Sequence, residues 1–160
     1  MNLDPVRRAL EPAVRRLLHA YWRFARGLTL GVRAVVIDPA GHVFLVRHSY
    51  VAGWHLPGGG VEAGETAGEA LARELLEEGG ITPTAPRLHG IIFFNARVSR
   101  RDHVAVYVVR EFTQAGGPRY AHEIVAHGFF PPDALPEGTT RGTRARLAEV
   151  LNGAALSAQW

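Results

Sequence analysis

Three glutamates spaced for one helix face have the clearest capacity for chemistry in this chain: Glu74, Glu77 and Glu78. At about 100° per residue they fall within an arc of roughly 100°, with Leu71 and Leu75 on the other side. Like charges at this spacing destabilise a helix unless a cation neutralises them. Oxygen donors without Cys or His favour a hard divalent ion, Mg²⁺ or Mn²⁺. We therefore predict a metal-binding face here.

The element that must position these glutamates is predicted from its ends. Residues 66–69 read Thr-Ala-Gly-Glu, which is a capping box, and Gly79-Gly80 provides a stop, so a helix should run from just after Thr66 to about Glu78. A Glu-rich arc is usually only the solvated side of a surface helix. The preceding residues 54–60, Trp-His-Leu-Pro-Gly-Gly-Gly, instead indicate a strand end followed by a glycine loop that a ligand can approach closely.

The loop and helix together resemble the box of the Nudix hydrolase family, the MutT-like pyrophosphohydrolases of nucleoside diphosphate derivatives. Residues 59–81 read GGVEAGETAGEALARELLEEGGI and match the family pattern at every fixed position. The resemblance extends over about residues 30–152 and implies an α/β fold, a Nudix-type α/β/α sandwich with a mixed β-sheet. The matching positions are Gly59, Glu65, Arg73, Glu74, Leu75, Glu77, Glu78, Gly80 and Ile81.

The resemblance implies hydrolysis of a pyrophosphate bond in a nucleoside diphosphate linked to another moiety, dependent on a divalent cation. Metal ligands would be Glu74, Glu77, Glu78 and the backbone carbonyl of Gly59. An activated water would attack phosphorus. The base is sometimes a box glutamate and sometimes one from a later loop, so the candidate catalytic residues are Glu77, Glu78 and Glu123.

The remaining candidate roles concern support and substrate binding. The resemblance implies that Glu65 and Arg73 brace the loop rather than take part in the chemistry. A regulator that binds nucleotide with little turnover is the alternative function, although the three retained carboxylates favour catalysis. The exact substrate is left open. Aromatic, amide and basic side chains that could contact it are Trp54, Phe93, Asn95, Arg97 and His127, with Tyr50 and His55 beside them.

Length and composition indicate one compact enzyme domain. The chain has 160 residues, of which 47% are hydrophobic, and all 18 basic residues are Arg. It has no Cys, no apolar run of the length needed to span a membrane and no typical signal peptide, so we expect a cytoplasmic location. We predict a Nudix domain over residues 30–152, flanked by an N-terminal helical extension at 1–29 and a C-terminal tail at 153–160.

Residues 1–29 carry a charge pattern of their own. Residues 1–26 hold six Arg against two acids, a net of +4, whereas the rest of the chain has a net of −1. Apolar residues recur at helical spacing with arginines opposite, which predicts a basic amphipathic helix with a kink or second start at Pro12. It could dock on its own domain, form a homodimer contact or lie on an anionic membrane surface. No recognised motif suggests a specific nucleic-acid partner.

The other elements follow from apolar runs and turn signals. Residues 31–38 and 42–48 should form a β-hairpin around Asp-Pro-Ala-Gly. Residues 88–97 and 103–112 should form a second pair, followed by a strand near 124–130 and a closing helix at 140–151. Strands with one helix between them and another at the end predict a mixed sheet covered by helices.

Overall fold

The computed structural model describes residues 4–95, 100–119 and 122–160. An N-terminal helix α1 (Asp4–Ala25) precedes the strands β1 (Thr29–Val36) and β2 (Val43–His48). Helix α2 (Ala67–Gly79) follows, and then come β3 (Ile81–Pro83), β4 (Arg87–Phe94), β5 (Asp102–Val109), β6 (Phe112–Gln114), β7 (Ile124–Phe130) and the closing helix α3 (Arg141–Asn152).

The central sheet is mixed, with strand order β1-β5-β4. β1 runs parallel to β5, and Thr29 lies opposite Asp102 while Val36 lies opposite Val109. β5 and β4 are antiparallel. Two further antiparallel pairs, β2 with β7 and β3 with β6, complete the strands. Parallel pairing of strands so distant in sequence requires a long crossover, and α2 lies within it.

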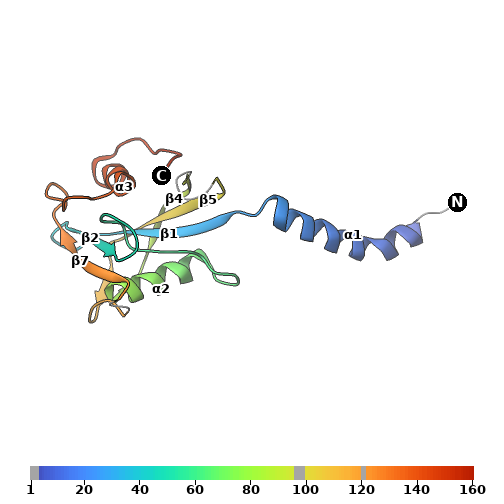
Figure 1. The fold of residues 1–160 in the computed structure, drawn as a ribbon, viewed down its shortest axis with the longest axis horizontal. Coiled ribbons are helices and arrows are strands. Elements are labelled where there is room, and N and C mark those ends of the chain that lie inside the picture. The colour runs from blue at the N-terminus through green and yellow to red at the C-terminus, as the bar shows by residue number, and fades with distance from the viewer. Residues whose placement is uncertain (1–3, 96–99, 120–121) are drawn as a thin grey trace.

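Helices α2 and α3 cover opposite faces of the strands (Figure 1). The alternation along β1 explains this, because successive side chains of a strand point to opposite faces. Val32 and Val36 belong to the core beside α2, whereas Val35 belongs to the core beside α3. Both faces of β1 are therefore buried. The expected α/β/α sandwich with a mixed sheet is confirmed.

The box helix forms as its local sequence predicts. The Thr66 hydroxyl accepts a hydrogen bond from the Glu69 N–H at 3.2 Å, and the Thr66 N–H donates to Glu69 Oε2 at 2.8 Å. At the other end Gly80 adopts φ 63°, a left-handed conformation suited to glycine, and ends the helix. The predicted β4–β5 pair, strand β7 and helix α3 are also confirmed.

The predicted hairpin of residues 31–38 and 42–48 is wrong. The turn is present, since the Asp38 N–H donates to the His42 carbonyl at 3.0 Å and Ile37 forms a single bridge with Val43. Beyond that bridge β1 pairs with β5 and β2 pairs with β7. The turn is specified by neighbouring residues. The partner of each strand is instead decided by how both faces of β1 pack, and a local sequence pattern does not contain that information.

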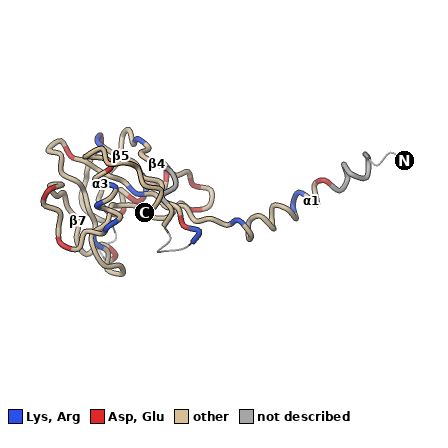
Figure 2. Tube along the Cα trace, turned by 90° about the horizontal axis from the view of Figure 1, so that it is seen from above, with Lys and Arg blue, Asp and Glu red and all other residues tan. Residues whose placement is uncertain are grey.

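Helix α1 is a single continuous helix that contains Pro12 and extends away from the body of the molecule (Figures 1 and 2). Its apolar side chains Leu17 and Phe24 are 72% and 75% exposed. The structure therefore does not show the helix docked on its own domain, which was one of the three alternatives. Among the described residues, no helix is long and apolar enough to cross a membrane.

The C-terminal residues 153–160 pack on the body as an added edge. The Phe94 N–H donates to the Ala158 carbonyl at 2.9 Å, and the Trp160 N–H donates back to the Phe94 carbonyl at 3.1 Å. The fully buried Arg146 guanidinium of α3 donates to the Gln159 carbonyl at 2.9 Å. This segment is thus a wall of the domain, a role that the expected tail did not include.

Candidate active site

A small cavity of about 260 Å³ brings the predicted metal donors together. The glycine loop forms one side, α2 contributes the three glutamates, and the turn before β7 contributes Glu123 from another side. Residues far apart in sequence therefore meet in one place. The lining consists of Arg33, Tyr50, Gly58, Gly59, Gly60, Glu74, Glu77, Glu78, Glu123 and Ile124.

Glu78 is the most buried of the carboxylates, with 7% of its surface exposed. Its Oε2 accepts a hydrogen bond from the Gly58 N–H at 2.7 Å, and its Oε1 lies 3.4 Å from His48 Nε2. Burial raises the pKa of Glu78 to about 8, against the opposing effects of Arg33 and the Gly58 N–H. Burial also lowers the pKa of His48 to about 4, so this imidazole is neutral near pH 7 and does not supply a full positive charge.

Arg73 ties the glycine loop to the helix. Its Nε donates to Glu65 Oε1 at 2.9 Å, its Nη2 donates to the Gly60 carbonyl at 3.0 Å, and its Nη1 donates to Glu74 Oε1 at 2.7 Å. The hydrogen bonds from Arg73 hold the pKa of Glu65 below its usual range. The structure thus brings Glu65 and Arg73 together, and their bracing role stays a prediction.

Gly59 has little room for a side chain. A Cβ at this position would overlap the Glu74 carboxylate. The Gly59 carbonyl already accepts a hydrogen bond from the Val32 N–H at 2.8 Å, which leaves its second lone pair for another partner. The neighbouring Gly58 has φ 134° and also faces the Val32 carbonyl, so the loop lies close against β1.

The donor set of the small cavity fits a hard divalent cation. It offers carboxylate and carbonyl oxygens, the donors that such an ion prefers. Within the part of the chain that the structure describes, no three acidic or imidazole side chains are already gathered as a ligand set. The contacts explain this, because Glu74 turns to Arg73 and Glu78 turns to Gly58. Binding an ion would require these side chains to turn toward it.

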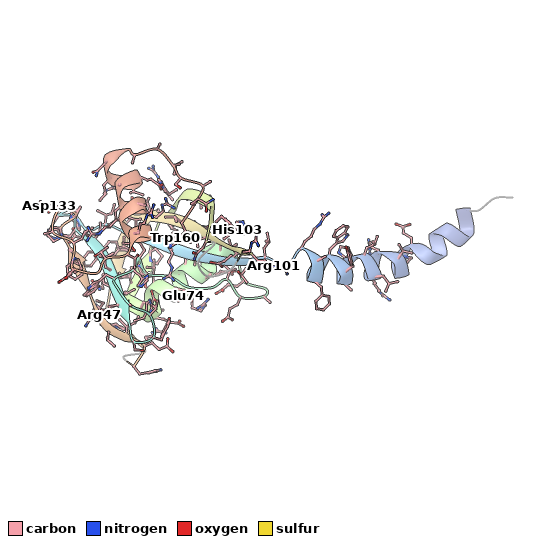
Figure 3. All side chains as sticks on the ribbon, turned by 45° about the horizontal axis from the view of Figure 1, so that its top comes forward. Arg47, Glu74, Arg101, His103, Asp133 and Trp160 are labelled. Carbon is pink, nitrogen blue, oxygen red and sulfur yellow. The ribbon has the colours of Figure 1, made fainter. Side chains whose placement is uncertain are left out.

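A larger cavity of about 1080 Å³ adjoins the small one. The two share Arg33, Tyr50, Gly59 and Gly60 in their linings. Asn95, which we predicted to bind substrate, lines the large cavity, as do Tyr50 and His55. Helix α3 and the C-terminal segment form another part of its wall, including Trp160. Figure 3 labels Trp160 and Glu74 within the body of the molecule.

The other predicted substrate residues are placed differently. Trp54 packs edge-on against Phe130, with ring centroids 5.0 Å apart, at the core beside α3. His127 lies on β7 beside Phe44. Neither side chain belongs to the lining of the two cavities described above. Arg97 and the side chain of Phe93 lie outside the described residues.

Sequence reasoning missed Arg33 and His48. Arg33 lies on β1, lines both cavities and donates from Nη1 to the Leu56 carbonyl at 2.9 Å. Its signal was an arginine inside an otherwise apolar run, since a charge on a buried strand needs a reason. His48 ends β2 at a register shift and is buried against Glu78. No sequence pattern distinguishes it from the other histidines.

Comparison with known proteins agrees with this geometry. The family model for the NUDIX domain matches residues 27–151. A MutT-like protein from Streptomyces ambofaciens is 29% identical over 126 residues, 79% of each chain. A putative 8-oxo-dGTP diphosphatase from Bacillus subtilis is 44% identical over 52 residues, which cover 32% of this chain and 35% of that protein.

Solved structures show the same fold. The crystal structure of the MutT NUDIX hydrolase from Burkholderia pseudomallei has a TM-score of 0.66 and 29% identity, covering 76% of this chain and 97% of that one. A MutT protein structure from Bacillus halodurans has a TM-score of 0.62, covering 82% of this chain and 85% of that one. The chain belongs to the NUDIX family and is a Nudix hydrolase of the pyrophosphohydrolase class.

Proposed function

We propose that the protein hydrolyses a pyrophosphate bond in a small nucleotide, a nucleoside diphosphate linked to another moiety. The observation that carries this proposal is the pair of adjoining cavities, one lined by carboxylates and the other large enough for a nucleoside. Arg33 and the Gly59-Gly60 backbone belong to both linings. A substrate that bridges the two would place its diphosphate at this boundary.

The metal ligands that we propose are Glu74, Glu77, Glu78 and the Gly59 carbonyl, and the ion is Mg²⁺ or Mn²⁺. Their oxygen chemistry and their common cavity support the assignment. A bound divalent cation would neutralise phosphate oxygens and lower the pKa of a water. Glu65 and Arg73 would keep the loop and helix in register, since Arg73 contacts both.

Two further residues have proposed roles at the reacting diphosphate. Arg33 would contact a phosphate oxygen at the boundary between the cavities, because its hydrogen bond to Leu56 fixes one side of the guanidinium. Glu123 would accept the proton of the attacking water. Its half-exposed carboxylate lines the small cavity from the turn before β7, away from the carboxylates of α2. Glu77 and Glu78 are the other candidates for this base.

For the nucleoside, we propose binding in the large cavity beside Tyr50, His55 and Asn95. The name of one relative, a putative 8-oxo-dGTP diphosphatase, supports oxidised nucleoside triphosphates as the first substrates to test, with the ordinary ones beside them. An aromatic side chain and an amide at the wall could stack on a base and hydrogen-bond its edge. Trp54 and His127 have no place in this proposal, because they lie outside both linings.

The test is product analysis with purified protein and Mg²⁺ over a panel of substrates. The panel contains ordinary and oxidised nucleoside triphosphates, dinucleoside polyphosphates, ADP-ribose, NADH and nucleotide sugars. We expect turnover of one class, cleavage at a pyrophosphate bond, and loss of turnover when the divalent ion is chelated. Tight nucleotide binding with no turnover of any class would instead support the regulator alternative.

A further inference from the structure

Helix α1 has two faces of opposite character, and both are exposed. At about 100° per residue, the described apolar side chains cover an arc of about 120° and the basic ones an arc of about 100° on the other side. The apolar face consists of Val14, Leu17, Leu18, Tyr21 and Phe24. The basic face consists of Arg15, Arg16, His19 and Arg26.

The aromatic side chains Tyr21 and Trp22 of α1 have positions typical of a helix that lies at a membrane–water interface. Trp22 falls between the two faces, and the Arg26 guanidinium stacks over its ring at 3.6 Å from the centroid. The Tyr21 ring meets the Trp22 ring edge-on at 5.0 Å. Amphipathic rings and arginines with long apolar stems are suited to the boundary between water and lipid.

Helix α1 lies outside the domain that the family model matches. The NUDIX domain match begins at residue 27, and the Burkholderia pseudomallei structure is covered over 97% of its length by 76% of this chain. Among the described residues, the side chains of α1 stand clear of the body in Figure 3. The helix therefore lies outside the matched domain, and that domain leaves its apolar face uncovered.

We propose that α1 lies on an anionic membrane surface, with its apolar face in the lipid and its arginines at the headgroups. Charge complementarity carries the assignment, because residues 1–26 have a net charge of +4 while the rest of the chain has −1. No described helix can cross a membrane, so the attachment is peripheral. The connection from α1 to β1 is only residues 26–28, which places the body close to the lipid.

A second copy of the chain fits this helix less well. Pairing two such helices through their apolar faces would leave the arginines on the outer sides without an anionic partner, since Asp4 and Glu11 are the only acids in residues 1–26. The apolar arc is also broader than the narrow seam of a two-stranded coiled coil. Lipid covers a broad arc and anionic headgroups neutralise arginines, so the membrane satisfies both faces at once.

The experiment is vesicle co-sedimentation of the full chain. Vesicles of phosphatidylcholine alone are compared with vesicles that also contain phosphatidylglycerol. We expect binding to the anionic vesicles to exceed binding to the neutral ones by about tenfold or more. Raising the salt from about 0.1 M to about 1 M should release the protein, because the screening length falls from about 10 Å to about 3 Å.

Matched variants test whether the apolar face and the basic face of α1 each contribute to vesicle binding, and a variant in the body controls for a general effect of substitution. Leu17→Glu combined with Phe24→Glu should lower binding by at least about tenfold per site, since each removes a large apolar contact with lipid. Arg15→Gln with Arg16→Gln should lower it about fivefold per arginine. Leu88→Glu changes an exposed leucine of β4 in the body and should leave binding unchanged.

Thermal unfolding of each variant shows that the body remains folded, independently of any activity. The proposal is overturned if the full chain ignores anionic vesicles, or if the Leu17→Glu, Phe24→Glu variant binds them as well as the original chain does. It is also overturned if light scattering shows a dimer that this variant abolishes while vesicle binding is absent. That result would assign the apolar face to a second copy.

Discussion

The side chains around Glu78 show how one cavity can be prepared for a cation. A carboxylate that is 7% exposed is costly to ionise, and Arg33 and the Gly58 N–H offset this cost only in part, because the pKa of Glu78 stays raised. Glu74 and Glu77 add negative charge nearby and raise the pKa of Glu78 further. A divalent ion would reverse this balance by stabilising the ionised form.

Replacing Glu78 with Gln tests the proposed ligand at constant shape. The amide can still accept the Gly58 hydrogen bond, so we expect the unfolding midpoint to stay the same or rise. We expect kcat to fall by roughly two orders of magnitude or more, the scale seen when one electrostatic stabilising group is lost. Steady-state kinetics at saturating Mg²⁺ measures the fall, and an unchanged rate would remove Glu78 from the metal site.

Replacing Glu123 should change the kinetics differently from replacing Glu78, because Glu123 is proposed as a base rather than a metal ligand. Glu123→Gln should lower kcat by about 10²–10⁴-fold, the usual contribution of general base catalysis, with the Mg²⁺ requirement unchanged. The control is Glu111→Gln, an exposed glutamate outside both cavity linings. If Glu123→Gln behaves like this control, the base must be sought among the glutamates of α2.

At the scale of elements, the sequence predicts what is decided locally. The α2 helix is bounded by its own capping box and glycine stop, so its limits could be read within a residue. The carboxylate face of α2 follows from the same periodicity. The pairing of β1 with β5 is decided by contacts between residues more than seventy positions apart, and the local turn at residues 38–41 therefore suggested the wrong partner.

The glycine loop gives an element-scale prediction with a matched control. In Gly59→Ala the added methyl would push the Glu74 carboxylate aside, and because that group is the flexible end of a side chain, folding stability should change little. The Mg²⁺ concentration for half-maximal rate should rise by roughly 10–100-fold, as for displaced ligand support. Gly60→Ala adds a methyl into open space and should leave this concentration unchanged. Equal effects of the two changes would contradict the geometry.

At the scale of the whole molecule, the basic N-terminal segment ends where the NUDIX fold begins. The body has the NUDIX fold and a net charge of −1, whereas residues 1–26, which include the projecting helix α1, have a net charge of +4 (Figure 2). The sequence predicted this helix and its two faces, since periodicity and charge are local. It could not predict that the C-terminal residues form a wall of the large cavity, because their contacts with Phe94 and Arg146 join distant segments.

Deleting residues 1–26 tests this division. Because α1 extends away from the body, we expect kcat/KM on a soluble substrate to stay within about a factor of two, as for distant independent sites. The unfolding midpoint of the body should also be unchanged, while vesicle binding is lost. Kinetics, thermal unfolding and co-sedimentation on the same preparations separate these readouts. A fall in the unfolding midpoint together with aggregation would mean that α1 covers apolar surface of the body. The alternative in which α1 docks on its own domain would then be the correct one.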